Sequence, residues 1–119
     1  MGTGNINIQI VEQVLRGVVN FPAHLTSAMI KAVIAVEYNI SEEDLTSRSR
    51  KKDICLPWQI VMYLSRKYTK ESLSEIGDTL NKNYATVLHA VRKISELLHR
   101  DTSLQGQVKI LEGKLHLSQ

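Results

Sequence analysis

Residues 81–94, with the sequence NKNYATVLHAVRKI, combine a hydrophobic face with a second face that a core helix does not need. The hydrophobic residues recur at every third or fourth position, which predicts a helix with one buried side: Val87, Leu88, Val91 and Ile94. Thr86, His89 and Lys93 fall on the opposite side. That side is either solvated or a binding surface.

The first turn of this helix carries groups that can read a nucleic-acid base. Asn83 can cap the helix and also pair with a base edge, Tyr84 and Thr86 bring hydroxyl groups, and Ala85 can touch a thymine methyl. In a helix-turn-helix, the first turn of the second helix meets base edges in the major groove, while the rest of the motif contacts phosphates. The alternative is a set of capping or solvated side chains, and this alternative is stronger for His89, which lies deeper in the helix.

Catalytic and metal-binding patterns are missing from the sequence. The histidines show no metal-ligand spacing with one another or with Cys55: His24, His89, His99 and His116. No glycine-rich phosphate loop occurs. The acidic residues 42–44 are typical of a solvated helix start. We therefore expect no enzymatic activity, and neither a metal nor a cofactor in this chain.

The net charge of +3 conceals an uneven distribution. Residues 1–46 carry two Lys or Arg against five Asp or Glu, whereas residues 47–100 carry eleven against five. A basic half beside an acidic half indicates an anionic partner, with nucleic acid as the leading candidate. A single cysteine, no signal-peptide pattern and no apolar run near the roughly 20 residues of a membrane helix favour a cytoplasmic protein without a membrane span.

The elements that position these residues are predicted to be helices throughout. Helical spacing recurs over residues 6–18. A second helix is expected to start after Thr26, whose hydroxyl can cap it, and to run to Glu37, with Met29, Val33 and Val36 on one face. A short helical turn should follow the Ser41–Asp44 capping pattern and end near residue 46.

Residues 46–53, TSRSRKKD, are expected to form a loop because four cations in five positions cannot pack in a core. Pro57 is expected in the first turn of the next helix, where its missing amide would have had no partner. The inward residues of that helix should be Ile60, Val61, Leu64 and Tyr68.

Residues 72–100 have the outline of a helix-turn-helix. Ser72 and Glu75 form a capping box for a short helix to about Leu80, and a polar turn of about three residues leads to the long helix, which should reach about Arg100. Gly77 lies where such motifs bring two helices close. A last helix should restart at Asp101 or Thr102 with Val108, Ile110, Leu111 and Leu115. The prediction is an all-α fold of about six helices.

The stretch NYATVLHAVRKISEL resembles the signature helix of the C-terminal DNA-binding domain of the bacterial replication initiator DnaA, which typically reads Asp-His-Thr-Thr-Val-Leu-His-Ala before a basic pair. The resemblance extends through SLSEIGDTL, LPWQIVMYLSRKYT and the basic SRSRKKD. It implies a Trp-repressor-like helical core. It also implies that residues 1–20 are a remnant of the last helix of an AAA+ ATPase lid, 21–40 a linker helix, and 41–119 the helix-turn-helix domain.

The resemblance implies binding of double-stranded DNA at replication-origin boxes, with nucleoid association in the cytoplasm. Arg50 takes the place of a loop arginine that enters the minor groove, and the major-groove readers would be Asn83, Tyr84, Ala85 and Thr86. The expected phosphate contacts, which include neighbouring cations of the loop and turn, are Arg48, Lys52, Gln59, Arg66, Ser72, Leu73, Lys82, His89 and Lys93.

The chain departs from the family pattern around the helix whose first turn is expected to contact bases. Of the four signature readers only Thr86 is retained, the turn before them is one residue shorter at Asn81-Lys82, and Trp58 replaces an arginine. ATP is expected only on an upstream ATPase module. The alternatives are a stand-alone transcriptional regulator of the same fold, or a protein-interaction module that self-associates through residues 5–18.

Overall fold

The computed structural model describes residues 25–48 and 51–115. This part of the chain contains helices and no strand, which confirms the all-α prediction. The helices are α2 Ser27–Glu37, α3 Glu42–Leu45, α4 Lys52–Tyr68, α5 Leu73–Leu80, α6 Tyr84–Leu97 and α7 Thr102–Lys114. The helix predicted over residues 6–18 and the minor-groove residue Arg50 lie outside the described residues.

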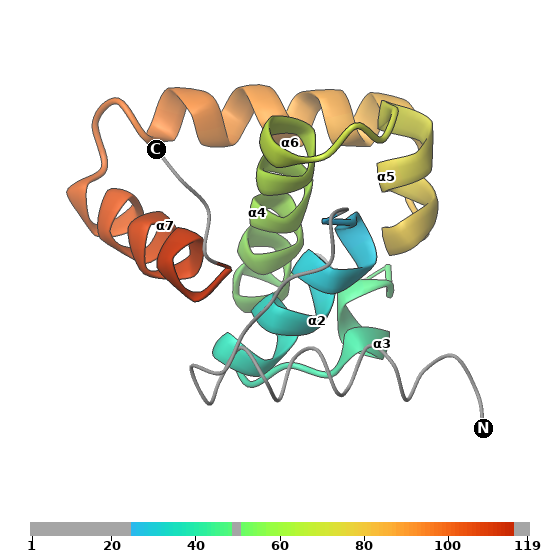
Figure 1. Cartoon of the computed structure of the whole chain (residues 1–119), viewed down its shortest axis with the longest axis horizontal. Helices are drawn as coiled ribbons and strands as arrows, with labels where there is room; N and C mark the ends of the chain where they lie inside the picture. Colours follow the sequence, from blue (N-terminus) through green and yellow to red (C-terminus); the bar gives the residue numbers. More distant parts are fainter. Residues whose placement is uncertain (1–24, 49–50, 116–119) are drawn as a thin grey trace.

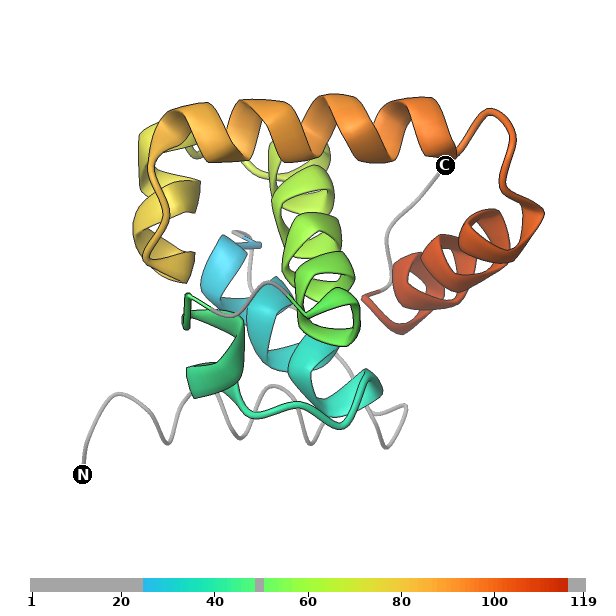
Figure 2. The same ribbon diagram turned by 180° about the vertical axis from the view of Figure 1, so that it is seen from behind.

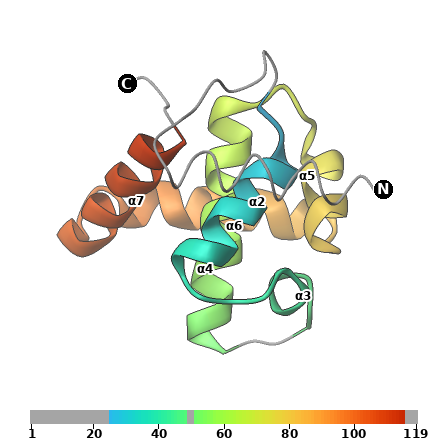
Figure 3. The same cartoon turned by 60° about the horizontal axis from the view of Figure 1, so that its bottom comes forward.

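Helix α4 is the central element of the fold. It packs against α2, α3, α5 and α6, and its Ile60, Val61 and Leu64 are fully buried as predicted. Helix α6 crosses one end of α4, while α5 and α7 lie on opposite sides of α4 (Figures 1 and 2). Figure 3 shows α2 in front of α6, with α3 to one side. All six helices contribute to one hydrophobic cluster.

Side-chain caps start the helices where the sequence predicts them. Thr26 Oγ1 accepts a hydrogen bond from the Met29 amide, and Ser41 Oγ accepts one from the Asp44 amide. Ser72 and Glu75 form the complete reciprocal capping box. These short-range signals confirm the predicted starts of α2, α3 and α5.

Helix α4 begins five residues earlier than predicted, so placing Pro57 in its first turn was wrong. The Lys51 carbonyl already accepts hydrogen bonds from the amides of Ile54 (3.0 Å) and Cys55 (2.8 Å). Residues 54–56 pack against the core, and their burial favours the longer helix. Proline inside a helix removes one hydrogen bond, here to the carbonyl of the exposed Asp53.

One further expectation was wrong. Helix α6 ends at Leu97 rather than Arg100, and the Leu97 carbonyl accepts a 2.8 Å bond from the Asp101 amide as the chain turns toward α7. Ile110 is 57% exposed because the core face of α7 is formed by Leu104, Val108, Leu111 and Leu115. Val36 is 49% exposed. It lies in the last turn of α2, whose fully buried side chains, such as Ile30 and Ile34, point to α4 and α5.

The start of α2 is fastened to the connection between α4 and α5. The amide and hydroxyl of Ser27 donate to the two oxygens of the Glu71 carboxylate, at 2.7 and 2.6 Å. Ser27 Oγ also lies 2.7 Å from Thr79 Oγ1 on α5, and Lys31 Nζ donates to the Thr79 carbonyl. Helix α2 is thereby attached to the first helix of the helix-turn-helix.

Candidate nucleic-acid interface

The turn between α5 and α6 is built from three polar residues, as predicted. Asn81 adopts a left-handed conformation with φ of 57°, which asparagine tolerates better than most residues. The Asn81 amide donates to the Asp78 carbonyl, and the Lys82 amide donates to the Gly77 carbonyl at 2.8 Å. This pair of bonds is a Schellman ending, and it sets the path of the chain into α6.

Gly77 is the point of closest approach between α5 and this turn. A Cβ atom at position 77 would lie 2.3 Å from the Lys82 carbonyl oxygen, far inside van der Waals contact. Only glycine therefore fits without a shift of the backbone. The close approach that the sequence pattern predicted at Gly77 is present.

Asn83 uses its side-chain oxygen to start α6. Its Oδ1 accepts hydrogen bonds from the Thr86 amide (2.9 Å) and the Thr86 hydroxyl (3.0 Å). The side-chain NH2 group of Asn83 is therefore the group that can donate a hydrogen bond to a bound partner. Asn83, Ala85 and Tyr84 are exposed, and Tyr84 has 59% of its surface accessible. Thr86 is half-buried.

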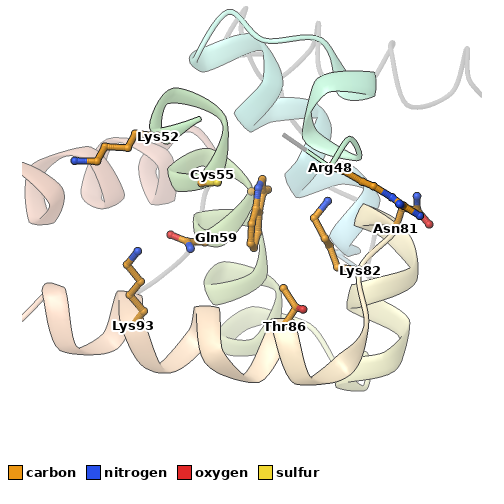
Figure 4. Close-up of a pocket in the computed structure, with 9 residues that line it drawn as sticks. Arg48, Lys52, Cys55, Gln59, Asn81, Lys82, Thr86 and Lys93 are labelled. Carbon is orange, nitrogen blue, oxygen red and sulfur yellow. The ribbon is translucent and has the colours of Figure 1, made fainter. Parts of the chain in front are cut away.

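A hollow of about 560 Å³ separates this turn from α4 (Figure 4). Lys52, Cys55 and Gln59 of α4 lie on one side of it, and Thr86 and Lys93 of α6 lie on the other. Its complete lining is Arg48, Lys52, Cys55, Trp58, Gln59, Asn81, Lys82, Thr86 and Lys93. Four of these side chains are cations from four parts of the chain, so the hollow concentrates positive potential that favours a polyanion.

Lys82 points back into the protein rather than out of the hollow. Its Nζ donates to the carbonyl oxygens of Ser47 (2.8 Å) and Leu80 (3.1 Å) and lies 5.2 Å from the centre of the Trp58 ring. Burial lowers the pKa of Lys82 below its usual value, and the nearby Cys55 opposes this shift.

The remaining predicted contacts lie away from the hollow. Arg66 is exposed in the last turn of α4, Ser72 is the exposed cap of α5, and Leu73 is half-buried against the core. His89 is exposed on α6. The structure thus gathers one group of predicted residues around the hollow: Arg48, Lys52, Gln59, Lys82, Thr86 and Lys93.

Sequence reasoning did not place Trp58 in the site. It identified Trp58 only as a departure from a family pattern, whereas the structure buries all but 8% of the side chain and sets its ring beside Lys82. The pairing brings together positions 24 residues apart, and no short-range pattern encodes it. Cys55 and Asn81 also line the hollow without having been predicted there.

The described residues hold neither a cluster of metal ligands nor a membrane-spanning helix. In residues 25–48 and 51–115, no three His, Cys, Asp or Glu side chains gather as metal ligands would. Across the same ranges, no helix has the length and apolar character of a membrane span.

The sequence of the chain is similar to that of known proteins. A family model described as bacterial dnaA protein helix-turn-helix matches residues 27–94. The chain is 46% identical over 112 residues to the chromosomal replication initiator protein DnaA of Desulfotalea psychrophila, covering 94% of the chain and 23% of the relative. The protein of the same name from Desulfatibacillum aliphaticivorans is 38% identical over 115 residues, covering 97% of the chain and 25% of the relative. The chain spans about a quarter of the length of these curated relatives.

Proposed function

The chain belongs to the bacterial DnaA helix-turn-helix family, and from this we infer that it binds double-stranded DNA at replication-origin boxes in the initiation of chromosomal replication. The observation that carries the proposal is the cationic hollow between α4 and the first turns of α6. It brings charged side chains to the same face as the exposed start of α6, and a helix-turn-helix presents that helix start to the major groove.

In the proposed complex, affinity and specificity come from different groups. Phosphate contacts supply salt-dependent affinity and fix the position of the protein on the duplex, whereas base contacts supply specificity. We assign the major-groove contacts to residues 83–86 and the minor-groove contact to Arg50. The proposed phosphate contacts are Arg48, Lys52, Gln59, Arg66, Ser72, Leu73, His89 and Lys93.

The hydrogen bonds of Asn83 suggest which base edges it favours. Its oxygen is held by Thr86, so its amide can donate but has little capacity left to accept. Guanine O6 and N7, thymine O4 and adenine N7 are acceptors in the major groove, whereas the cytosine amine is a donor. We propose that Asn83 selects an acceptor edge and disfavours cytosine at its step.

In this proposal the chain binds DNA and carries out no catalysis of its own. Residues 1–20 would be the end of an ATPase lid, 21–40 a linker helix and 41–119 the DNA-binding domain, with ATP bound only on an upstream module. Nucleoid association in the cytoplasm would follow from origin binding.

Fluorescence anisotropy with two duplexes tests the proposal. One duplex carries a DnaA-type nonamer box and the other a scrambled sequence, and each is titrated across a salt series. We expect tighter binding to the box that persists as salt rises, since base contacts do not depend on counterion release. Equal, steeply salt-dependent binding to both duplexes would reject recognition of the usual box, and binding to neither at low salt would reject DNA binding altogether.

A further inference from the structure

Lys82 joins three parts of the molecule that are distant in the sequence. Its ammonium group donates to the carbonyl of Ser47, which precedes the cationic segment, and to that of Leu80 at the end of α5. The same group lies 5.2 Å from the centre of the Trp58 ring of α4. The turn before the reading helix is therefore held to α4 and to the chain that follows α3.

Each partner of Lys82 is itself fixed. Ser47 donates through its hydroxyl to the Asp44 carbonyl at 2.7 Å, so it is bound to the end of α3. Trp58 is 92% buried in the core and cannot swing away. An ammonium group over an indole face is attracted by the ring quadrupole, more strongly where water is excluded. Lys82 thus connects rigid parts rather than mobile side chains.

The position of Lys82 is a poor one for binding a phosphate. Its donors face two carbonyl oxygens inside the protein, and partial burial lowers the pKa of its ammonium group. Arg48, Lys52 and Lys93 line the same hollow and are exposed. The charge of Lys82 is directed inward while its neighbours face outward.

We propose that Lys82 and Trp58 are positioning residues, which lock the segment at Ser47 and Arg48 to the turn of the helix-turn-helix so that Arg48 and the start of α6 meet DNA at a fixed separation. The DNA-dependent part of this inference rests on the proposed function.

The salt dependence of binding separates this role from a phosphate contact. If Lys82 contacts a phosphate, Lys82→Met should weaken binding to all sequences alike and reduce the salt slope by about 1. If Lys82 positions the segment, the variant should lower the ratio of box to scrambled affinity and leave the slope unchanged. Lys93→Met removes an exposed cation of the hollow and serves as the comparison variant, which should show the behaviour of a lost phosphate contact.

The variant set is designed to keep the fold. We expect Lys82→Met to lower the ratio of box to scrambled affinity by about fivefold, the size of one cation–π contact that is not fully desolvated. Lys82→Arg retains the charge and the ring contact and should restore most of the ratio. Lys82→Met combined with Trp58→Leu should lower the ratio no further than Lys82→Met alone, because loss of the ammonium group already removes its contact with the Trp58 ring. Lys70→Met removes an exposed lysine of the α4–α5 connection as a control.

A measurement without DNA distinguishes failure of this inference from failure of the proposed function. Hydrogen exchange at the amides of Ser47 and Arg48 should accelerate in Lys82→Met, while exchange in α7 stays at the wild-type rate. Accelerated exchange supports the lock even if the wild type binds neither duplex. Unchanged exchange at residues 47 and 48, or a uniform affinity loss with a slope reduced by about 1, would overturn it.

Discussion

Asn83 illustrates how one side chain can serve both folding and recognition. Its oxygen completes the start of α6 by accepting two bonds from Thr86, while its NH2 group stays exposed on the proposed DNA face. The related family pattern has an aspartate at this position, which can cap a helix equally well but presents only acceptors. The fold therefore tolerates either residue, and only the readout of the base distinguishes them.

We predict that Asn83→Asp preserves stability and changes base preference. The cap remains, so the free energy of unfolding should change by no more than about 0.5 kcal/mol. The lost donor and gained acceptor should shift preference toward cytosine at one position of the box, by about 1–3 kcal/mol. Competition binding with boxes varied one base at a time measures the shift, and an unchanged ranking of the variants would remove Asn83 from the reading set.

At the scale of the element, the connection between α5 and α6 is specified by its backbone. The left-handed Asn81 and the absence of a Cβ at Gly77 allow a three-residue turn with two helix-closing hydrogen bonds. The geometry of α6 relative to α5 follows from these two positions.

We predict that Gly77→Ala is destabilising although alanine normally favours helices. The added Cβ would meet the Lys82 carbonyl oxygen at 2.3 Å, and relieving this contact should cost about 1–3 kcal/mol. Gly106→Ala is the matched control, because no atom lies within 4 Å of its added Cβ, and it should stabilise α7 by about 0.5–1 kcal/mol. Urea unfolding measures both, and equal effects of the two substitutions would contradict the close approach.

We also predict that α5 loses stability in acid through Glu75. Hydrogen bonds from the Ser72 amide and then the Ser72 hydroxyl hold the pKa of Glu75 below its usual value. The carboxylate therefore contributes stability above the pKa that Glu75 has in the unfolded chain, and this contribution is lost as pH falls through the lowered folded-state pKa.

Stability measured against pH for the wild type and Glu75→Gln tests this prediction. The wild type should be more stable at neutral pH, and the difference should shrink toward strong acid. Asp78→Asn, which changes another exposed acid of α5, serves as the control. A difference that is independent of pH would exclude a role for the Glu75 charge.

The sequence predicted elements better than contacts between them. Caps such as Ser72 with Glu75, and Asn83 with Thr86, operate over three residues, so their patterns are visible in the sequence. The start of α4 was missed because burial of residues 54–56 outweighs the local preference of Pro57 for a first turn. The contact between Trp58 and Lys82 depends on how α4 and the turn pack, which no local pattern encodes.

At the scale of the whole molecule, α7 closes the core on the side of α4 opposite α5. Its Glu112 is only 5% exposed, accepts a hydrogen bond from the Tyr68 hydroxyl and forms an ion pair with Lys67 at 3.6 Å. Tyr38, the residue that follows α2, donates through its hydroxyl to Gln107 of α7. One buried carboxylate therefore helps to fasten α7 to the end of α4.

We predict that Glu112→Ala destabilises the fold by about 1–3 kcal/mol, because it removes a buried carboxylate that accepts a hydrogen bond from Tyr68 and pairs with Lys67. Chemical denaturation measures the loss, with Glu96→Ala on the exposed face of α6 as the control. The ratio of box to scrambled affinity should remain that of the wild type under conditions where the variant is folded. A change in this ratio would show that α7 takes part in DNA recognition.

The bonds between Ser27 and Glu71 have a mechanical consequence. A pull on the chain at Leu25 acts on a point anchored to the α4–α5 connection, so the load passes directly to the helix-turn-helix instead of unwinding α2 first. Helix α2 and the helix-turn-helix, which includes α6, then rotate together as one rigid body, so torque applied to α2 is transmitted to α6. Glu71→Ala would remove the two bonds to the α4–α5 connection and leave the contacts of Ser27 and Lys31 with Thr79 to carry the load.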